Sequence, residues 1–231
     1  MIIIGKNVAK EYLETNNKIN KVYICNVFND KNLISTIKNR RINICYLNKN
    51  ELDKIDNGNH QGIILDVPEY KYYDFEQIDV KENRLIVMLD HIEDTHNFGA
   101  IIRTCESAGV NWIIIPKDRS VDINSVVMKT SAGALNNICI SKVSNLVNTI
   151  SKLKKMGYWI IGTDMENSID YRSIDYDMPI VLIIGNEAVG ISKIVRDNCD
   201  IVASIPMKGR INSLNASVAA GILIYKIVEK D

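Results

Sequence analysis

Short apolar runs alternate with amphipathic segments along the 231 residues, and this alternation constrains the fold more than any other feature. Runs such as Arg84–Asp90 (RLIVMLD) and Ile180–Ile184 (IVLII) have the length and continuous apolar character of strands buried on both faces. Most of the runs are followed by segments in which apolar residues recur at helical spacing. Strands that alternate with helices predict an α/β protein with mostly parallel sheets.

The alternation forms two series, one on each side of residues 68–83. In the first series we expect strands at 21–25, 42–47 and 62–67 and helices at 5–16, 31–39 and 49–55. In the second we expect strands at 84–90, 112–116, 138–141, 158–164, 180–184 and 201–205 and helices at 97–108, 123–130, 146–156, 191–198 and 214–228. The second series predicts an open sheet covered by helices on both faces.

The stretch Pro68–Asn83 interrupts the rhythm. It combines Pro68 with three tyrosines and scattered charges, and its apolar residues follow no clean period. We interpret it as a linker, because a structureless stretch of this length is uncommon inside a compact domain. The sequence therefore predicts an N-terminal domain at 1–67, a linker at 68–83 and a larger domain at 84–231.

Composition excludes several classes of protein. Apolar residues make up 46% and charged residues 24%, as in ordinary globular proteins, and no uncharged apolar run approaches the ~18 residues of a membrane span. The opening residues lack the longer apolar core of a secretory signal, and the five cysteines are odd in number and widely spaced, so we expect a protein of the reducing cytoplasm. His91 and His96 are five residues apart, which does not place both on one helix face, and we expect no metal site.

The charge balance gives no direct indication of a nucleic-acid partner. The chain has 28 basic and 28 acidic residues, a formal net charge of +0, whereas a strongly basic chain would point to nucleic acid. Any polyanion would have to be held by a local patch. The clearest basic cluster is Lys38, Arg40 and Arg41, which could equally be a solvated helix end.

Open parallel sheets bind ligands beyond the carboxyl ends of their strands, so the segments that follow strands are the informative ones. After the strand at 84–90 a polar loop leads to Asn97 and then to Arg103 on a largely apolar helix. A planar guanidinium suits a phosphate or a carboxylate, although Arg103 could also be an ordinary surface arginine. Asn97 could equally be the N-cap of the helix.

Two further segments follow strands. After 180–184 comes Gly185-Asn186-Glu187, where backbone amides could hold a polar cofactor or Gly185 could form a plain left-handed turn. This segment is neither a dinucleotide fingerprint nor a P-loop, because GxGxxG and GK[ST] are absent. After 201–205 a polar loop reaches Ser213, which could be an N-cap, and a helix that begins with small residues suited to a tight cleft or a helix contact.

These segments together carry a family resemblance. The motifs are NFGAIIRTC (97–105), KTSAGAL (129–135), IIGNEAVGIS (183–192) and IPMKGRINSLNASVAAGILIYKI (205–227), with GKNVAKEYL (5–13) and HQG (60–62) upstream. In this order and spacing the chain resembles the SpoU (TrmH-type) family of RNA 2′-O-ribose methyltransferases in the SPOUT superfamily. It is most similar to the branch that modifies a guanosine of 23S ribosomal RNA.

The resemblance implies a Rossmann-like parallel sheet with a C-terminal trefoil knot, preceded by a small ribosomal-protein-like α/β domain that binds RNA. Physical reasoning alone would not predict a knot, because knots are nearly absent among folds. The resemblance also implies S-adenosylmethionine as cofactor and a homodimer formed through the catalytic domain. By position, cofactor contacts carry over to Gly185, Ile205 and Leu214. Functional side chains carry over to Asn97, Arg103, Glu187, Ser213 and Asn215.

The implied reaction moves a methyl group from a sulfonium to a ribose 2′-hydroxyl, a poor nucleophile while it keeps its proton. A guanidinium has a pKa above 12 and rarely gives up a proton, so we expect Arg103 to bind a phosphate and to stabilise developing alkoxide charge. The basic residues Arg40 and Arg41 would contact the RNA substrate. Three alternatives stay open: a transfer RNA substrate, a non-catalytic RNA-binding or ribosome-assembly protein on the same fold, and a nucleotide-dependent oxidoreductase.

Overall fold

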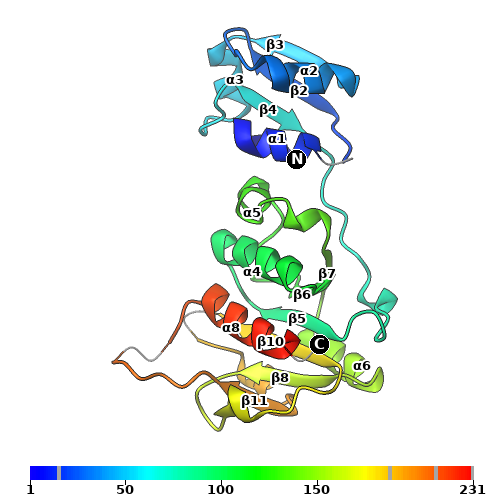
Figure 1. The fold of residues 1–231 in the computed structure, drawn as a ribbon, viewed down its shortest axis with the longest axis vertical. Coiled ribbons are helices and arrows are strands. Elements are labelled where there is room, and N and C mark those ends of the chain that lie inside the picture. Colours follow the sequence, from blue (N-terminus) through cyan, green and yellow to red (C-terminus); the bar gives the residue numbers. More distant parts are fainter. Residues whose placement is uncertain (15–16, 187–188, 211–212, 230–231) are drawn as a thin grey trace.

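The computed structural model describes residues 1–14, 17–186, 189–210 and 213–229. Within these residues the strands that precede residue 68 form a four-stranded sheet and the strands that follow residue 83 form a seven-stranded sheet; Figure 1 shows the first sheet above the second. The α/β class with a parallel seven-stranded sheet and a smaller preceding α/β unit is confirmed, whereas the C-terminal knot stays a prediction. In the described part of the chain, every helix is too short or too polar to cross a membrane.

The N-terminal sheet is mixed, which corrects the expectation of mostly parallel pairing. Its spatial order is β1 (Ile2–Ile4), β4 (Ile63–Asp66), β2 (Lys21–Cys25) and β3 (Ile44–Leu47), and β4 is antiparallel to both of its neighbours. Only β2 and β3 pair in parallel. The chain enters β4 through a turn at Gln61 and Gly62, where both φ angles are positive, and this turn directs β4 back between β1 and β2.

Three helices pack on this sheet: α1 (Lys6–Glu14), α2 (Lys31–Asn39) and α3 (Lys49–Ile55). Asp30 caps α2 by accepting the Leu33 N–H, and Asn48 and Glu51 form a capping box on α3. The core of the unit joins buried residues of α1 and α2 to the inner faces of β1, β2 and β4.

The C-terminal sheet is parallel throughout its described pairs, in the order β7-β6-β5-β10-β8-β11-β9. Its strands are β5 (Leu85–Asp90), β6 (Trp112–Pro116), β7 (Cys139–Val143), β8 (Trp159–Thr163), β9 (Ile169–Asp170), β10 (Ile180–Gly185) and β11 (Ile201–Ser204). Its helices are α4 (Thr95–Ser107), α5 (Ser125–Thr130), α6 (Leu146–Lys155), α7 (Lys193–Arg196) and α8 (Ala216–Val228), with short 3-10 turns at Phe75–Gln77, Ala134–Asn136 and Tyr171–Ser173. Parallel pairing brings the carboxyl ends of the strands to one edge.

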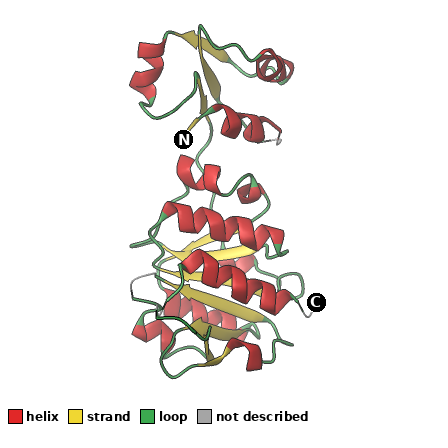
Figure 2. Ribbon diagram, turned by 60° about the vertical axis from the view of Figure 1, so that its left-hand side comes forward, coloured by secondary structure: helices red, strands yellow, loops and turns green. Residues whose placement is uncertain are grey.

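Helices cover both faces of this sheet, as expected (Figure 2). One face packs against α4, α5 and α8, and Phe98, Ile101 and Ile224 are buried in that layer. The other face packs against α6 and α7. Because both faces are covered, strands such as β5 and β10 are apolar along their whole length, which is why they are readable in the sequence.

Two differences from the predicted elements have local causes. The helix expected at 191–198 is only α7, because Ser192 has an extended backbone (φ −62°, ψ 146°) and the helix begins after it. Strands β1 and β9 were not predicted, because three and two residues are too few to show a period.

Residues 68–83 pack along the β7 side of the large sheet. Tyr70 donates its hydroxyl to the Ile138 carbonyl (3.1 Å), Tyr72 donates to Asp122 Oδ1 (2.9 Å), and Tyr73 forms an isolated bridge with Ser141. The tyrosines that interrupt the sequence rhythm therefore anchor this segment. The N-terminal unit also touches α5, since Met128 packs against both cores.

Candidate active site

A cavity of about 300 Å³ lies at the carboxyl edge of the large sheet, where β8, β10 and β11 end and α8 begins. The volume is at the lower end of the range typical of small-molecule sites. Three predicted cofactor residues and one predicted catalytic residue line it: Gly185, Ile205, Leu214 and Ser213. The structure therefore brings together residues that are up to 29 positions apart in sequence.

Gly185 ends β10 and is required there by a close backbone approach. A Cβ on this residue would lie 2.1 Å from the Gly190 carbonyl carbon and 2.2 Å from the Ile191 nitrogen. The chain returns over Gly185 because Asn186 and Gly190 exchange backbone hydrogen bonds of 3.0 and 2.8 Å. The alternative of a left-handed turn at Gly185 is wrong: positive φ (69°) occurs at Gly190 instead. The result is a cavity wall made of backbone.

A carboxylate forms another part of the wall. Asp164 follows β8, and its Oδ1 accepts the N–H groups of Met165 (2.6 Å) and Glu166 (3.1 Å). Its Oδ2 pairs with Arg196 Nη1 at 2.9 Å. Among the described residues that line the cavity, Asp164 is the only one with an ionisable side chain. No motif or spacing in the sequence marks Asp164.

Small residues of α8 complete the cavity. Ala216 and Ala219 line it, while a Cβ on Gly221 would lie 3.9 Å from Thr104 Cγ2 of α4. The two uses expected for this small-residue segment, a tight cleft and a helix contact, therefore both occur. Figure 1 shows residues 205–210, which follow β11, in orange and extending away from the body of the molecule.

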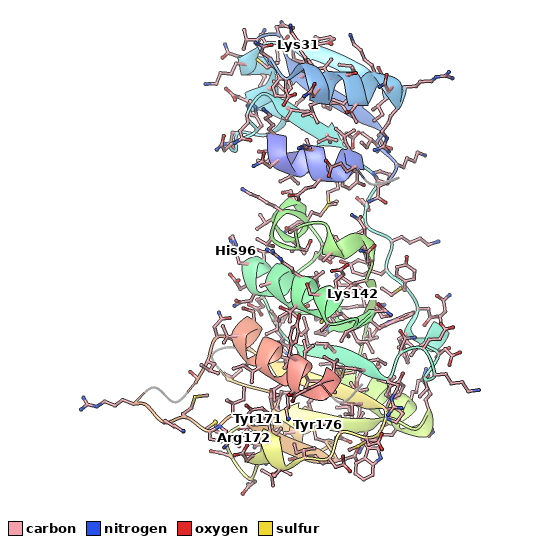
Figure 3. All side chains as sticks on the ribbon, in the orientation of Figure 1. Lys31, His96, Lys142, Tyr171, Arg172 and Tyr176 are labelled. Carbon is pink, nitrogen blue, oxygen red and sulfur yellow. The ribbon has the colours of Figure 1, made fainter. Side chains whose placement is uncertain are left out.

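The starts of α4 and α8 meet through two asparagines. Asn215 Nδ2 donates to Asn97 Oδ1 at 2.9 Å, and Asn215 Oδ1 also caps α8 by accepting the Ser217 N–H at 2.9 Å. The N-cap of α4 is Asp94, which accepts the Asn97 N–H, so the N-cap alternatives for Asn97 and Ser213 are both wrong. In Figure 3, His96 marks this end of α4, on the side to which the orange segment extends.

Arg103 lies on α4 two turns beyond Asn97, exposed and outside the residues that line the cavity. No ion pair among the described residues includes it. Its guanidinium is therefore not neutralised by a carboxylate in the described part of the chain. Glu187, the remaining predicted catalytic residue, lies outside the described residues.

The predicted basic cluster splits into two different environments. Arg40 Nη1 donates to the Leu13 carbonyl (2.8 Å) and Nη2 to the Asn17 carbonyl (2.7 Å), so this side chain holds the C-terminal end of α1. Arg41 is exposed, with a left-handed backbone (φ 54°). Of the two arginines, Arg41 is the one that faces solvent.

The HQG segment is a turn rather than a reactive group. His60 is buried, its Nε2 lies 2.8 Å from Asp53 Oδ1, and its Nδ1 accepts the Gly62 N–H at 3.0 Å. Gln61 Oε1 accepts the Lys6 N–H at the start of α1 (2.8 Å). These residues border a second cavity of about 840 Å³ in the N-terminal unit, beside Lys6 and Lys49.

A thiol nucleophile near the site is excluded by burial. Cys199 packs against Gly162 of β8, and burial raises the pKa of its thiol to about 12. Cys105 of α4 is fully buried, which raises the pKa of its thiol further above the ordinary value. Both thiols stay protonated at neutral pH and are unreactive.

Two family models match the chain. The model described as the SpoU rRNA Methylase family matches residues 84–225, and the model described as RNA 2′-O ribose methyltransferase substrate binding matches residues 2–73. Proteins named TrmH family tRNA/rRNA methyltransferase are similar over almost the full length. One from Staphylococcus haemolyticus is 37% identical, and the match covers 100% of this chain and 96% of that protein. One from Staphylococcus aureus is 39% identical, and the match covers 99% of this chain and 96% of that protein.

Solved structures share the fold. An AdoMet-bound rRNA methyltransferase from Sinorhizobium meliloti has a TM-score of 0.81 and 26% identity and covers 99% of this chain and 87% of its own. The SpoU methyltransferase AviRb from Streptomyces viridochromogenes, in complex with AdoMet, has a TM-score of 0.81 at 22% identity, covering 100% and 90%. A TrmH/SpoU tRNA modifying enzyme from A. aeolicus has a TM-score of 0.59 at 34% identity, and the match covers 64% of this chain and 75% of that enzyme.

Proposed function

This chain belongs to the SpoU rRNA methylase family, and from that membership we propose that it methylates the 2′-hydroxyl of a ribose in RNA. It is an S-adenosylmethionine-dependent RNA methyltransferase of the TrmH/SpoU family. The observation that carries the proposal is the backbone-walled cavity at Gly185, which adjoins the paired asparagines Asn97 and Asn215.

The cavity suits S-adenosylmethionine. The close approach at Gly185 leaves a wall of backbone groups, and such groups can hydrogen-bond a polar cofactor without a dedicated side chain. The charged wall residue, Asp164, is an acid and so favours a cationic donor, although Arg196 offsets part of its charge. Gly185, Ile205 and Leu214 would hold the cofactor. When bound, it supplies a methyl group on a positively charged sulfur, which is a good leaving group.

The side chains have to manage the ribose, because a protonated hydroxyl is a poor nucleophile. Arg103 would bind a substrate phosphate through two parallel hydrogen bonds and stabilise negative charge as it develops on the ribose oxygen. The Asn97–Asn215 pair fixes the junction of α4 and α8 relative to the cavity. Ser213, at the cavity wall, would contact the ribose, and Glu187 is proposed on the family pattern alone. Holding the two reactants in position can supply several kcal/mol of the rate enhancement.

The favoured substrate is a guanosine of 23S ribosomal RNA, bound in part by the N-terminal unit. The match of residues 2–73 to a substrate-binding model supports a separate RNA-binding domain at 1–67, joined by a linker at 68–83. The Sinorhizobium rRNA methyltransferase covers 99% of this chain, whereas the tRNA modifying enzyme covers only 64%. Arg41, and Arg40 to the extent that it can leave its carbonyl partners, would contact the RNA backbone.

A transfer RNA substrate is the second candidate, because the curated relatives are named for both RNAs. Mapping modified nucleotides by mass spectrometry in cells with and without the gene separates the two. Loss of one 2′-O-methylguanosine from 23S ribosomal RNA supports the proposal. A loss confined to transfer RNA would show that transfer RNA is the substrate. No loss in either RNA would support the alternative of a non-catalytic RNA-binding protein.

We also propose a cytoplasmic homodimer formed through the catalytic domain. The exposed face of α8 supports this assembly, since Val218 and Tyr225 are 50% and 52% exposed. Sedimentation of the purified chain at micromolar concentration tests it: a monomer mass would reject the dimer.

A further inference from the structure

Asp90 is the one acidic side chain in the described part of the molecule that is buried, with 1% of its surface exposed. The proposed reaction does not use this carboxylate. It is the last residue of β5, directly opposite Gly185 in the parallel pairing of β5 with β10. A buried carboxylate is costly unless hydrogen bonds compensate its charge, so the partners of Asp90 show what it is used for.

Its two oxygens bind two different loops. Oδ1 lies 2.5 Å from Nδ1 of His91, in the loop that follows β5. Oδ2 accepts the backbone N–H of Ser192 at 2.6 Å, in the segment that follows β10. An ionised carboxylate can only accept, so the imidazole donates from Nδ1. One carboxylate thus holds both the loop that follows it directly and a segment whose Ser192 is 102 residues further along the chain.

A third hydrogen bond closes the same junction. Asn186, which lines the cavity, donates from Nδ2 to the His91 carbonyl at 2.9 Å. His91 has a left-handed backbone conformation (φ 60°), which is unfavourable for residues other than glycine. Removing one partner of a buried, hydrogen-bonded charge leaves the charge uncompensated. The two segments are therefore expected to move as a unit.

Each segment leads to a different half of the proposed site. Asn186 and residues 189–190 belong to the cavity wall. Residues 91–94 lead directly into α4, which carries Asn97 and Arg103. The carboxylate of Asp90 therefore connects, by hydrogen bonds, the segment that follows the cavity wall to the loop that leads into the helix that would bind the RNA.

We propose that Asp90 is a positioning residue that couples donor binding to the placement of α4. Filling the cavity fixes Asn186 and Gly190. Beside the direct hydrogen bond from Asn186 to the His91 carbonyl, the carboxylate passes this restraint from Ser192 to the His91 imidazole, and so to residues 91–97. By thermodynamic linkage, RNA then binds more tightly when the donor is in place, and the donor binds more tightly when RNA is in place. This inference rests on the proposed function for the identity of the two ligands.

The first test needs no RNA. Backbone hydrogen exchange of residues 91–97 is measured with and without saturating S-adenosylhomocysteine, whose binding is followed separately by calorimetry. None of these seven residues lines the cavity, so slower exchange on binding reports transmission. In the wild-type chain we expect exchange there to slow at least about fivefold, the lower end of ordinary coupling. The second test is the affinity for in vitro transcribed 23S ribosomal RNA with and without the same ligand.

Four substitutions break or retain the junction. Asp90→Ala removes both acceptors, and Asp90→Asn keeps an oxygen for the Ser192 N–H. Ser192→Pro removes that N–H alone, at a φ of −62° that proline adopts without strain. Ser192→Ala keeps the N–H and removes the hydroxyl. Asp200→Asn is the matched control, because Asp200 also accepts one backbone N–H (Ile160, 2.8 Å) and one charged side chain (Lys154, 2.7 Å), away from the cavity.

Asp90→Ala and Ser192→Pro should reduce the slowing to less than about twofold, with a matching loss of donor-enhanced RNA affinity. Asp90→Asn and Ser192→Ala should keep most of both effects. Asp200→Asn should lower Tm. It should change neither the slowing of exchange at 91–97 on ligand binding nor the gain in RNA affinity that the ligand gives. The coupling is overturned if the wild-type chain binds the ligand and hydrogen exchange at 91–97 does not change. It is also overturned if Asp90→Ala binds the ligand and exchange there slows as much as in the wild type. A wild-type chain that fails to bind the ligand overturns the proposed function instead.

Discussion

Asn215, the cap of α8, donates a hydrogen bond of 2.9 Å to Asn97 near the start of α4, 118 residues earlier in the chain. This contact joins the segment after β11 to the segment after β5. It places the helix that carries Arg103 against the helix that borders the cavity.

Asn215→Ala should remove both the cap of α8 and the contact to Asn97. Loss of an N-cap costs about 1 kcal/mol of stability, so Tm should fall by a few degrees. Because α4 is then less well placed, kcat should fall more than KM for the donor rises. Asn215→Asp is the matched control, since it keeps the cap oxygen and loses only the amide that binds Asn97. Unchanged kcat in both variants would contradict the role given to the pair.

Gly185→Ala should abolish donor binding. The added methyl group would lie 2.1 Å from the Gly190 carbonyl carbon, so the returning backbone has to move out of the cavity wall. Calorimetry with S-adenosylhomocysteine should show at least about a hundredfold weaker binding, equivalent to about 2.7 kcal/mol. Gly209→Ala is the control, because a Cβ there meets nothing within 4 Å. Wild-type affinity in Gly185→Ala would show that the cavity is not the donor site.

Arg103→Lys should lower kcat at least about tenfold while donor affinity is kept. A lysine retains the positive charge, but its ammonium is a compact point charge without the planar fork of the guanidinium, so bidentate recognition of a phosphate is lost. Single-turnover transfer of a labelled methyl group measures the effect. Turnover close to wild type in Arg103→Lys would contradict the bidentate role and leave only a requirement for charge.

The two N-terminal arginines should separate into different phenotypes. Arg41→Ala should weaken RNA binding and reduce the slope of log affinity against log salt by about one, with little change in Tm. Arg40→Ala should lower Tm, because it removes the hydrogen bonds to the Leu13 carbonyl in the last turn of α1 and to the Asn17 carbonyl beyond it. RNA affinity measured from 50 to 200 mM salt, together with thermal melts, distinguishes them. An unchanged salt slope in Arg41→Ala would remove this residue from the RNA surface.

The sequence predicted those parts of the fold that repeat a local pattern. Strands buried on both faces, such as β5 and β10, are continuous apolar runs, and the capped helices α2 and α3 begin and end where predicted. The mixed pairing of the N-terminal sheet was missed, because strand direction depends on the turn at Gln61 and Gly62 and not on any period.

The candidate site was predictable only in part, for a related reason. Gly185, Ile205 and Leu214 follow strands, so position alone marked them, and the cavity brings them together. Asp90 and Asp164 were missed, because their roles arise from contacts 102 and 32 residues away in sequence. An acid that ends a fully apolar strand, as Asp90 does, is the one local signal that could have identified it.

A crystal structure with S-adenosylhomocysteine shows whether the cavity is the donor site. We expect density for the ligand in the cavity at the ends of β8, β10 and β11, in contact with Gly185, Ile205 and Leu214. Density at any other place on the chain, or none at a concentration that saturates binding in calorimetry, would contradict it.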